Sequence, residues 1–283
     1  MIEAGYKEIS GSKIYYETTG SGDPMIFLHA DTLDSRQWEE QFKYFSRKYQ
    51  VIRYDMRGFG RSDIPTNEPY SFSEDLNQLM KALSLQKAHL VGLSLGGAEI
   101  LNFALAHPQK VLSLVLVDSG IHGDEFEQSF KDSVKVVIDL AKMGELAKAR
   151  HTWSNLSFFD VSRGNSQVWS QVEQMINDTS CYRWYGDNQP ITSKPPAVER
   201  LSEIHIPTLI IVGEHDVSDF QRKAQLLHKG IHDSKFTVVP NAGHLSNMDN
   251  SDVFNLAVDT FLQNKFSYSP SPPACKNSFR NFC

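Results

Sequence analysis

Short apolar runs alternate with stretches of helical periodicity along most of the chain. Runs that are apolar throughout fit strands buried on both faces of a sheet, and the stretches between them place apolar residues at the spacing of a helix face. This order predicts an α/β fold, with a mostly parallel central sheet flanked by helices on both faces. The predicted strands are 25–28, 51–54, 89–93, 111–117, 208–212 and 235–239, and the predicted helices are 35–49, 73–85, 95–106, 220–229 and 252–263.

Three segments depart from this alternation. Residues 6–18 alternate in polarity around a Gly-Ser break, which predicts an opening hairpin. From about residue 121 the pattern becomes helical, polar and rich in aromatics, as expected of an inserted α-helical cap. Beyond about residue 267 the chain is rich in Ser and Pro, which predicts a disordered tail. The predicted units are core segments 1–120 and 201–266, a cap 121–200 and a tail 267–283.

Composition and charge exclude several classes of function. Apolar residues make up 40% of the 283 residues, enough for a substantial core, and the net charge of −6 is spread without a basic stripe. No run resembles a signal peptide or a membrane helix, and the three cysteines show neither a disulfide framework nor metal-ligand spacing. We expect a cytoplasmic monomer or homodimer without cofactor or metal, which binds neither nucleic acid nor membrane.

The strongest chemical signal is a Gly-x-Ser-x-Gly segment at residues 92–96. Such a segment also occurs by chance in ordinary turns, but here an apolar strand pattern precedes it and a helical pattern follows it. Small residues suit a sharp strand-to-helix turn, and the free N–H groups at the start of the helix point toward the serine oxygen. This context favours Ser94 as a nucleophile.

A nucleophilic serine needs a base, because an alcohol is a poor nucleophile at neutral pH. Of the ten histidines, His244 follows the last predicted strand and precedes the last helix. In hydrolases whose nucleophilic serine sits at a sharp strand-to-helix turn, the chain order is serine, acid, histidine, so the base comes last. His228 and His232 fit solvent-facing positions instead. Three others precede the acid: His29, His89 and His107.

The acid that orients the base should follow a strand that lies between Ser94 and His244. The strand pattern ending at Val212 is followed by Gly-Glu-His-Asp, which offers Asp216. We favour Asp216 because the loop must turn away from the strand before a side chain can reach the imidazole. Glu214 and Asp219 are the competing candidates.

Two further motifs complete a resemblance to a known family. Residues 27–31, Phe-Leu-His-Ala-Asp, are similar to a His-Gly-x oxyanion loop, and residues 55–62 to an Asp-x-Arg-Gly-x-Gly-x-Ser segment. We interpret 55–62 as structural, with Asp55 and Arg57 tying loops together. Together with the serine, acid and histidine motifs, these resemble the α/β-hydrolase superfamily, in particular its small carboxylesterase and enol-lactonase branch, over about residues 6–263.

The resemblance implies a serine hydrolase that cleaves a small carboxylic ester or lactone through an acyl-enzyme. It implies an oxyanion hole built from the backbone N–H groups of Leu95 and Asp31. Ala30 replaces the usual glycine and tolerates a positive φ poorly, so we expect a shifted loop path in which either Ala30 or Asp31 donates. The Asp31 side chain is expected to disfavour anionic substrates.

The aromatic residues of the inserted segment fit either an apolar pocket above Ser94 or the packed core of the cap. The candidates for substrate contact are Ala30, Trp153, Phe158 and Leu245. The same two roles are open to other aromatic residues of the segment, namely Phe159, Trp169, Tyr182, Trp184 and Tyr185.

Other activities use a similar scaffold. Carbon-carbon bond hydrolases, thioesterases and perhydrolases keep the same three residues, so they stay open as alternatives. Dehalogenases and epoxide hydrolases place Asp at the nucleophile position, and Ser94 argues against both. A non-catalytic ligand-binding homologue is a further alternative, although such a protein is expected to have lost one of the three residues.

Overall fold

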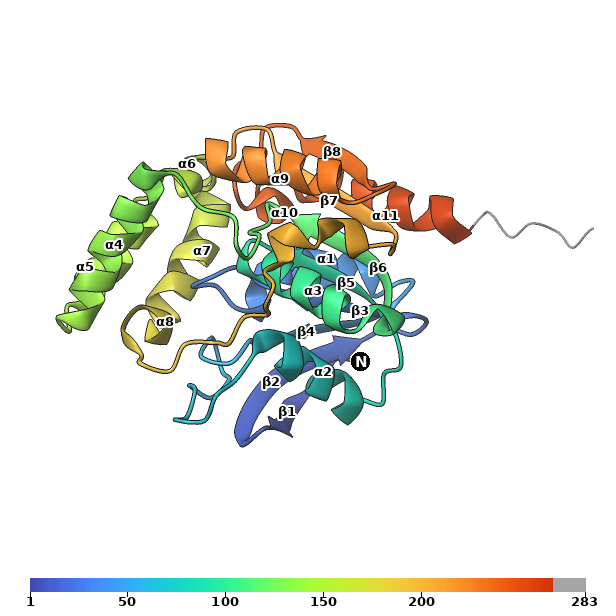
Figure 1. The fold of residues 1–283 in the computed structure, drawn as a ribbon, viewed down its shortest axis with the longest axis horizontal. Helices are drawn as coiled ribbons and strands as arrows, with labels where there is room; N and C mark the ends of the chain where they lie inside the picture. The colour runs from blue at the N-terminus through green and yellow to red at the C-terminus, as the bar shows by residue number, and fades with distance from the viewer. Residues whose placement is uncertain (267–283) are drawn as a thin grey trace, which may run out of the picture.

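An eight-stranded sheet runs through the protein, in a computed structural model that describes residues 1–266 (Figure 1). The strand order is β1-β2-β4-β3-β5-β6-β7-β8. The first two strands form the predicted hairpin and run antiparallel, and every pair from β4 to β8 is parallel. The strands are β1 (Glu3–Ile9), β2 (Ser12–Thr19), β3 (Pro24–Leu28), β4 (Gln50–Tyr54), β5 (Ala88–Leu93), β6 (Val111–Val117), β7 (Thr208–Gly213) and β8 (Lys235–Val239).

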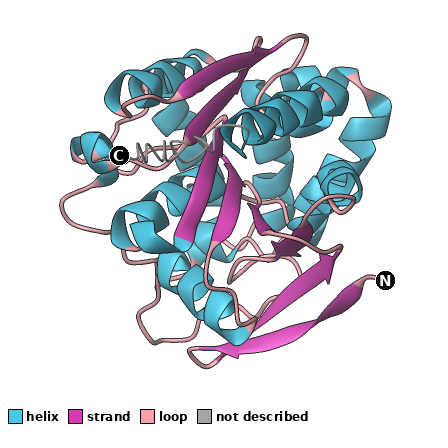
Figure 2. Cartoon of the chain, turned by 90° about the vertical axis from the view of Figure 1, so that its right-hand side faces the viewer, coloured by secondary structure: helices cyan, strands magenta, loops and turns pink. Residues whose placement is uncertain are grey.

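Helices cover both faces of this sheet, which confirms the predicted fold class (Figure 2). Successive residues of β3 face opposite sides of the sheet: Ile26 belongs to the apolar core that contains α2, α3 and α9, and Phe27 belongs to the core that contains α1 and α11. The central strands are therefore apolar throughout because both of their faces are buried. The flanking helices are α1 (Glu39–Phe45), α2 (Phe72–Ala82), α3 (Leu95–Ala106), α9 (Ser218–Gly230) and α11 (Ser251–Phe266).

One predicted helix differs from the structure. The helical pattern over 35–49 divides into a 3-10 turn, Ser35–Trp38, and the short helix α1, after which residues 46–49 lead directly into β4. Asp34 caps the turn by accepting from the Arg36 backbone N–H. None of the helices in residues 1–266 is both long and apolar enough to cross a membrane. The tail predicted at 267–283 lies outside the described residues.

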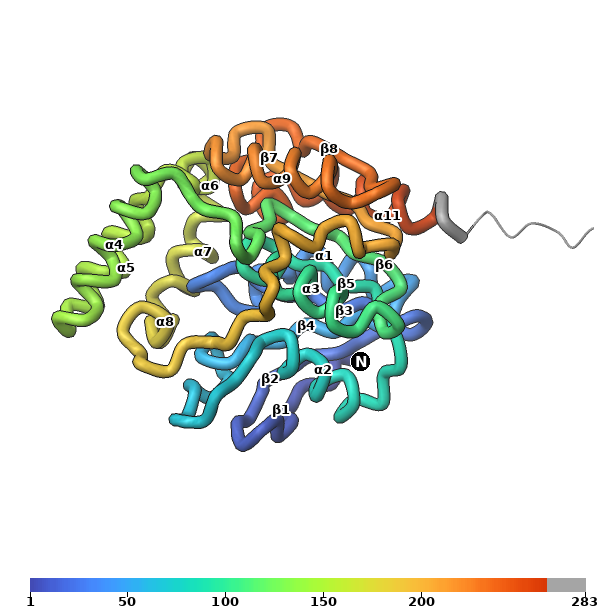
Figure 3. The backbone as a smooth tube through the Cα atoms, viewed as in Figure 1, coloured from blue at the N-terminus to red at the C-terminus, as the bar shows by residue number. Residues whose placement is uncertain are grey.

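Five helices lie between β6 and β7 in the chain and stand together at one side of the sheet (Figures 1 and 3). Their apolar side chains, among them Val137, Ala149 and Val172, join the same core as α1 and α11. We call α4 to α8 the inserted helices. They are α4 (Gln128–Lys142), α5 (Leu146–Ser154), α6 (Asp160–Gly164), α7 (Ser166–Asp178) and α8 (Tyr182–Tyr185). A short helix, α10 (Ser246–Asp249), precedes α11.

A buried ion pair joins the opening hairpin to α2. The Arg57 guanidinium donates to both carboxylate oxygens of Asp75, at 2.8 and 2.7 Å, and also to Ser12 Oγ and the Ile9 carbonyl. The side chains of Arg57 and Asp75 are 2% and 5% exposed. Because buried charges need partners, this network fixes the place of residues 55–62 against the sheet.

We expect Arg57→Met to lower the free energy of unfolding by about 3–5 kcal/mol, because Asp75 would be left buried without its cation. Urea unfolding followed by circular dichroism measures this loss. Lys43→Met is the control: Lys43 is 60% exposed, and loss of its exposed pairs with Glu39 and Glu40 should cost no more than about 1 kcal/mol. Equal losses in the two variants would contradict the prediction.

Candidate active site

Ser94 lies in a sharp turn between the end of β5 and the start of α3. Its backbone has φ 54° and ψ −109°, a conformation that residues other than glycine rarely adopt. Three backbone hydrogen bonds hold it: Ser94 N–H donates to the Val117 carbonyl at 2.9 Å, and the Ser94 carbonyl accepts from Ala98 at 3.1 Å and Gly120 at 3.0 Å. The turn places Ser94 at the wall of a cavity.

Two glycines allow this turn to close. A Cβ atom on Gly92 would lie 2.4 Å from the Gly96 carbonyl oxygen, and one on Gly96 would lie 2.3 Å from the Leu28 carbonyl oxygen. Both contacts are with backbone atoms, which cannot move aside as a side chain can. The first and last glycines of the Gly-x-Ser-x-Gly segment are therefore dictated by the close approach of α3 to β3 and β5.

His244 is hydrogen-bonded to Asp216. The distance from His244 Nδ1 to Asp216 Oδ2 is 3.0 Å, and both side chains are buried. The other oxygen of Asp216 accepts from the Val217 backbone N–H at 2.8 Å, which fixes the orientation of the carboxylate. With a carboxylate at Nδ1, the proton of a neutral imidazole lies on that nitrogen, and Nε2 is left to accept. His244 and Ser94 line the same cavity.

The two competing acids have other partners. Glu214 is half exposed and accepts from the Asn241 backbone N–H at 2.9 Å. Both carboxylate oxygens of Asp219 accept from the Glu127 backbone N–H at 3.1 Å, and one pairs with Arg222. Within residues 1–266, Asp216 is the acid that the structure brings to His244.

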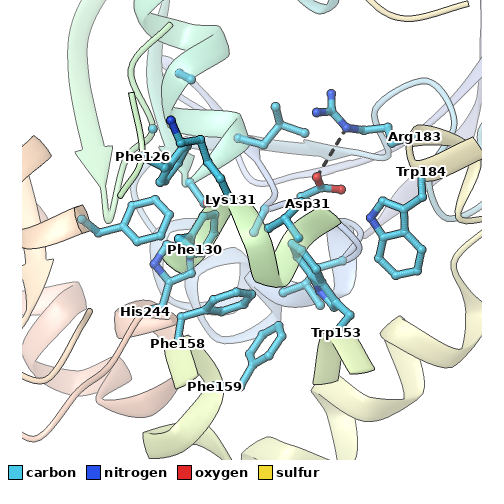
Figure 4. Close-up of a pocket in the computed structure, with 18 of the residues that line it drawn as sticks. Asp31, Phe126, Phe130, Lys131, Trp153, Phe158, Phe159, Arg183, Trp184 and His244 are labelled. Carbon is cyan, nitrogen blue, oxygen red and sulfur yellow. Dashed lines mark ion pairs between the residues drawn. The ribbon is translucent and has the colours of Figure 1, made fainter. Parts of the chain in front are cut away.

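Aromatic rings enclose the imidazole of His244. The centroid of the Phe220 ring lies 4.0 Å from the centroid of His244, and that of Phe158 lies 5.4 Å from it. Figure 4 shows His244 beside Phe158 at the cavity. Phe220 was not among the predicted site residues, although its place at the start of a helix just after Asp216 was a usable signal.

A second buried acid, Asp118, was missed by the sequence reasoning. It follows the end of β6 and is 0% exposed. Its oxygens accept from the Gly213 N–H at 2.7 Å, the Ser246 hydroxyl at 2.6 Å and the Ser246 N–H at 3.3 Å. Burial, together with the charge of Asp216, raises the pKa of Asp118 well above its usual range. Asp118 thus joins the strand that precedes Asp216 to the residues that follow His244.

The loop after β3, residues 29–34, is organised by His29, and we call it the oxyanion loop after the role predicted for it from the sequence. His29 Nε2 accepts from the Met56 backbone N–H at 2.9 Å, so Nδ1 carries the proton and donates to the Ala30 carbonyl at 2.7 Å. Burial lowers the pKa of His29, which favours this neutral form. The Gly96 N–H donates to the His29 carbonyl at 3.1 Å, so the loop lies against the start of α3.

The backbone of Ala30 has an ordinary conformation. Ala30 does not have a positive φ; the left-handed residue of the loop is Thr32, with φ 64°. The Ala30 N–H donates to Gln37 Oε1 at 2.8 Å and is therefore already engaged. By contrast, no group in residues 1–266 accepts a hydrogen bond from the backbone N–H of Asp31 or of Leu95. Of the two residues considered, Asp31 is the one with a free donor.

The charge of Asp31 is compensated by Arg183 of α8. Asp31 Oδ2 lies 3.4 Å from Arg183 Nε, and Figure 4 shows this pair across the top of the cavity. The expected repulsion of anionic substrates by Asp31 is therefore offset by an adjacent cation. No sequence pattern indicates this pair, because its partners come from distant parts of the chain.

The cavity over Ser94 has a volume of about 450 Å³ and a mostly apolar wall. All four predicted substrate-contact residues line it, namely Ala30, Trp153, Phe158 and Leu245. Phe159 and Trp184 also line it, whereas Trp169, Tyr182 and Tyr185 do not. In the described part of the chain, no group of three or more His, Cys, Asp or Glu side chains could hold a metal ion.

One wall of the cavity was not predicted. It is formed by α4 and the residues just before it, which contribute an apolar face with two lysines at its edge. The amphipathic pattern of this helix was a signal for one buried face, but not for what that face contacts. These wall residues are Phe126, Phe130, Lys131, Val134, Lys135 and Ile138.

Comparison with known proteins places this site in a family. The family model described as "alpha/beta hydrolase fold" matches residues 23–251. The 2-hydroxy-6-oxononadienedioate/2-hydroxy-6-oxononatrienedioate hydrolase of Comamonas testosteroni is 26% identical over 93% of this chain and 96% of its own length. The 3-oxoadipate enol-lactonase 1 of Acinetobacter baylyi is 26% identical over 81% of this chain and 85% of its own.

A solved structure shares the whole architecture. The crystal structure of a hydrolase from Pseudomonas aeruginosa superposes with a TM-score of 0.76 at 25% identity, covering 92% of this chain and 98% of that one. The family match covers well over half of the chain, and the mostly parallel eight-stranded sheet agrees with it. The protein therefore belongs to the α/β-hydrolase fold family.

Proposed function

We propose that the protein is a serine hydrolase that cleaves a small carboxylic ester or lactone through an acyl-enzyme intermediate. The observation that carries this proposal is that Ser94 and the Asp216-bound His244 line one apolar cavity. A serine, a base and an acid that orients the base are the components of nucleophilic acyl transfer. The free N–H groups of Asp31 and Leu95 supply an oxyanion hole.

In the proposed reaction, Ser94 Oγ attacks the carbonyl carbon while His244 Nε2 takes the hydroxyl proton. The carbonyl electron pair moves to oxygen, and the N–H groups of Asp31 and Leu95 bind the resulting oxyanion. Asp216 holds the imidazole in the required tautomer and stabilises its protonated form. His244 then gives the proton to the leaving alcohol oxygen. Water repeats the sequence on the acyl-enzyme, which releases the acid and restores Ser94.

The cavity indicates the size and character of the substrate. A volume of about 450 Å³ with a largely apolar wall suits a small molecule with an apolar body. The inserted helices supply much of that wall and in our proposal act as a cap over Ser94. The likeness to an enol-lactonase supports a cyclic or open-chain ester as the bond that is cleaved.

Cleavage of a carbon-carbon bond is a second candidate function. The relative from Comamonas testosteroni is named as a hydrolase of 2-hydroxy-6-oxononadienedioate and is similar over 93% of this chain. The same serine, histidine and acid could add a nucleophile to a ketone, and the compensated charge of Asp31 would not repel an acidic substrate. Ester cleavage stays the first proposal, because it needs no group beyond those already placed at the cavity.

We expect Ser94→Ala to reduce kcat for p-nitrophenyl acetate by a factor of about 10⁵–10⁶, because the nucleophile is lost. Release of p-nitrophenolate measures the rate, and an unchanged melting temperature shows that the fold is retained. Ser119→Ala is the matched control: its buried hydroxyl donates only to the Gly120 carbonyl, and its activity should stay within about tenfold of wild type. Equal rates for wild type and Ser94→Ala would refute the proposal.

We expect Asp216→Asn to lower kcat for the same ester by about 10³–10⁴-fold, because the imidazole loses its orienting acid and correct tautomer. Glu214→Gln and Asp219→Asn serve as controls, since their carboxylates bond to Asn241 and Glu127 instead. Both should keep kcat within a few-fold of wild type. A larger loss in either control than in Asp216→Asn would reassign the acid.

A panel of substrates separates the two candidate functions. Specificity constants are measured for p-nitrophenyl butyrate, an enol-lactone and a vinylogous 1,5-diketone of matched size. We expect the ester or the lactone to exceed the diketone by at least about tenfold, a difference of about 1.4 kcal/mol in transition-state binding. A diketone that is cleaved fastest, with activity that still depends on Ser94, would establish the carbon-carbon bond activity instead.

A further inference from the structure

The oxyanion loop contains a residue in an unfavourable conformation. Thr32 has φ 64°, in the left-handed region that favours glycine and that a β-branched side chain disfavours. Thr32 is buried and directly follows Asp31, whose N–H is the proposed oxyanion donor. A residue held in this way needs surrounding contacts that fix it.

The side chain of Thr32 has two hydrogen bonds. Its hydroxyl donates to the Asp31 carbonyl at 2.6 Å and accepts from the indole Nε1 of Trp153 at 2.8 Å. An indole N–H can only donate, so the single hydroxyl proton is directed to the Asp31 carbonyl. The Trp153 side chain, also buried, thereby determines the orientation of the Thr32 hydroxyl.

Hydrogen bonds from His29 and from Thr32 fix the peptide groups on the two sides of Asp31. On one side, the Ala30 carbonyl accepts from His29 Nδ1 at 2.7 Å. On the other, the Asp31 carbonyl accepts from Thr32. Because the Ala30 carbonyl and the Asp31 N–H share one planar peptide group and point in opposite directions, fixing the carbonyl also directs the N–H.

We propose that Trp153 and Thr32 are positioning residues that, together with His29, hold Asp31 so that its N–H can bind the oxyanion, and that the inserted helices thereby control the rate as well as the cavity. This inference rests on the acyl-enzyme mechanism proposed above. Trp153 acts through Thr32 and the backbone of the oxyanion loop, and its indole N–H has no direct part in the chemistry.

The inserted helices are tied to the oxyanion loop at two further points. Arg183 of α8 pairs with Asp31, with 3.4 Å between Nε and Oδ2. The Arg36 guanidinium pairs with Asp34 of the loop at 2.6 Å and with Asp178 at the end of α7 at 2.9 Å. All three ion pairs are partly exposed to solvent, whereas the bond between Trp153 and Thr32 is buried. The bond between Trp153 and Thr32 is thus the connection in which both side chains are withdrawn from solvent.

Trp153 is itself held by the aromatic core of the inserted helices. Its ring centroid lies 5.2 Å from that of Phe158 and 5.5 Å from that of Trp184 (Figure 4). Movement of α5 relative to the sheet would therefore change the bond to Thr32. The oxyanion loop would respond to such a movement even where no substrate contacts it.

The consequence is an effect on kcat. The oxyanion exists only after Ser94 Oγ has bonded to the carbonyl carbon and His244 Nε2 has taken the proton. A misdirected N–H therefore weakens binding of the transition state more than binding of the substrate. A loss of cavity wall at Trp153, by contrast, would weaken substrate binding and raise KM.

The test compares four variants with p-nitrophenyl acetate. Trp153→Phe removes the indole N–H, and Thr32→Val removes the hydroxyl at nearly constant shape. We expect each to lower kcat by about 10–100-fold, less than full loss of an oxyanion donor, with KM within about threefold of wild type. Thr32→Ser keeps the hydroxyl and should recover most of the activity. The control is Trp169→Phe, which changes another tryptophan of the inserted helices that packs on Phe159 outside the cavity.

An inhibitor gives a second measurement. Ser94 Oγ adds to the carbonyl carbon of a trifluoromethyl ketone. The adduct carries an oxyanion at the position where the transition state carries one. We expect its inhibition constant to rise in Trp153→Phe and Thr32→Val by the factor by which kcat/KM falls. The double variant should lose no more than either single variant, because both interrupt one connection.

Several outcomes would overturn the inference. A rise in KM at constant kcat, or equal weakening of substrate and inhibitor, would make Trp153 a wall residue alone. Kinetics like those of Trp169→Phe would show that the bond is without effect. If Trp153→Phe does not fold, Thr32→Val alone decides between these results. Equal activity of wild type and Ser94→Ala would instead refute the proposed function, which separates that failure from failure of the inference.

Discussion

The backbone at Ser94 is the constraint on which the site depends. Its φ of 54° is sustained by hydrogen bonds to Val117 and Gly120, which bring the ends of β5 and β6 together. The same turn carries α3 so close to β3 that the Gly96 N–H reaches the His29 carbonyl at 3.1 Å. One local conformation therefore exposes the serine, leaves the Leu95 N–H free and sets the oxyanion loop against the start of α3.

Buried carboxylates hold the other loops to this turn. Asp118 accepts from Gly213 and Ser246, and so connects the end of β7 with the start of α10. Asp249 accepts from the Gly243 N–H at 2.9 Å and the Ser162 hydroxyl at 2.7 Å, which connects the loop of His244 to the inserted helix α6. A buried acid that has lost its donors is costly, so these networks favour one loop arrangement over the alternatives.

The parts that could be predicted from sequence depend on short stretches of chain. Strands buried on both faces and the turn at Ser94 are specified by neighbouring residues, and both were predicted. The choice of Asp216 over Glu214 depends on the path of a loop after β7, which no residue pattern specifies. The pair of Asp31 with Arg183, and the left-handed Thr32, depend on packing between segments far apart in the chain. Local propensity argues against a β-branched residue at such a position, and the sequence indicates only a shifted loop path, from Ala30 in place of the usual glycine.

Substitutions in different parts of the cavity wall are expected to affect different steps of the proposed reaction. Val134 and Ile138 of α4 line the cavity, and no hydrogen bond connects them to the oxyanion loop, so their size can alter substrate fit alone. Trp153 lines the same cavity and also bonds to Thr32, so any change there acts on substrate fit and on the proposed oxyanion donor together. Variation in substrate preference within this architecture is therefore less costly on α4 than on α5, because the α5 wall, unlike the α4 wall, is bonded to the loop of the proposed oxyanion donor.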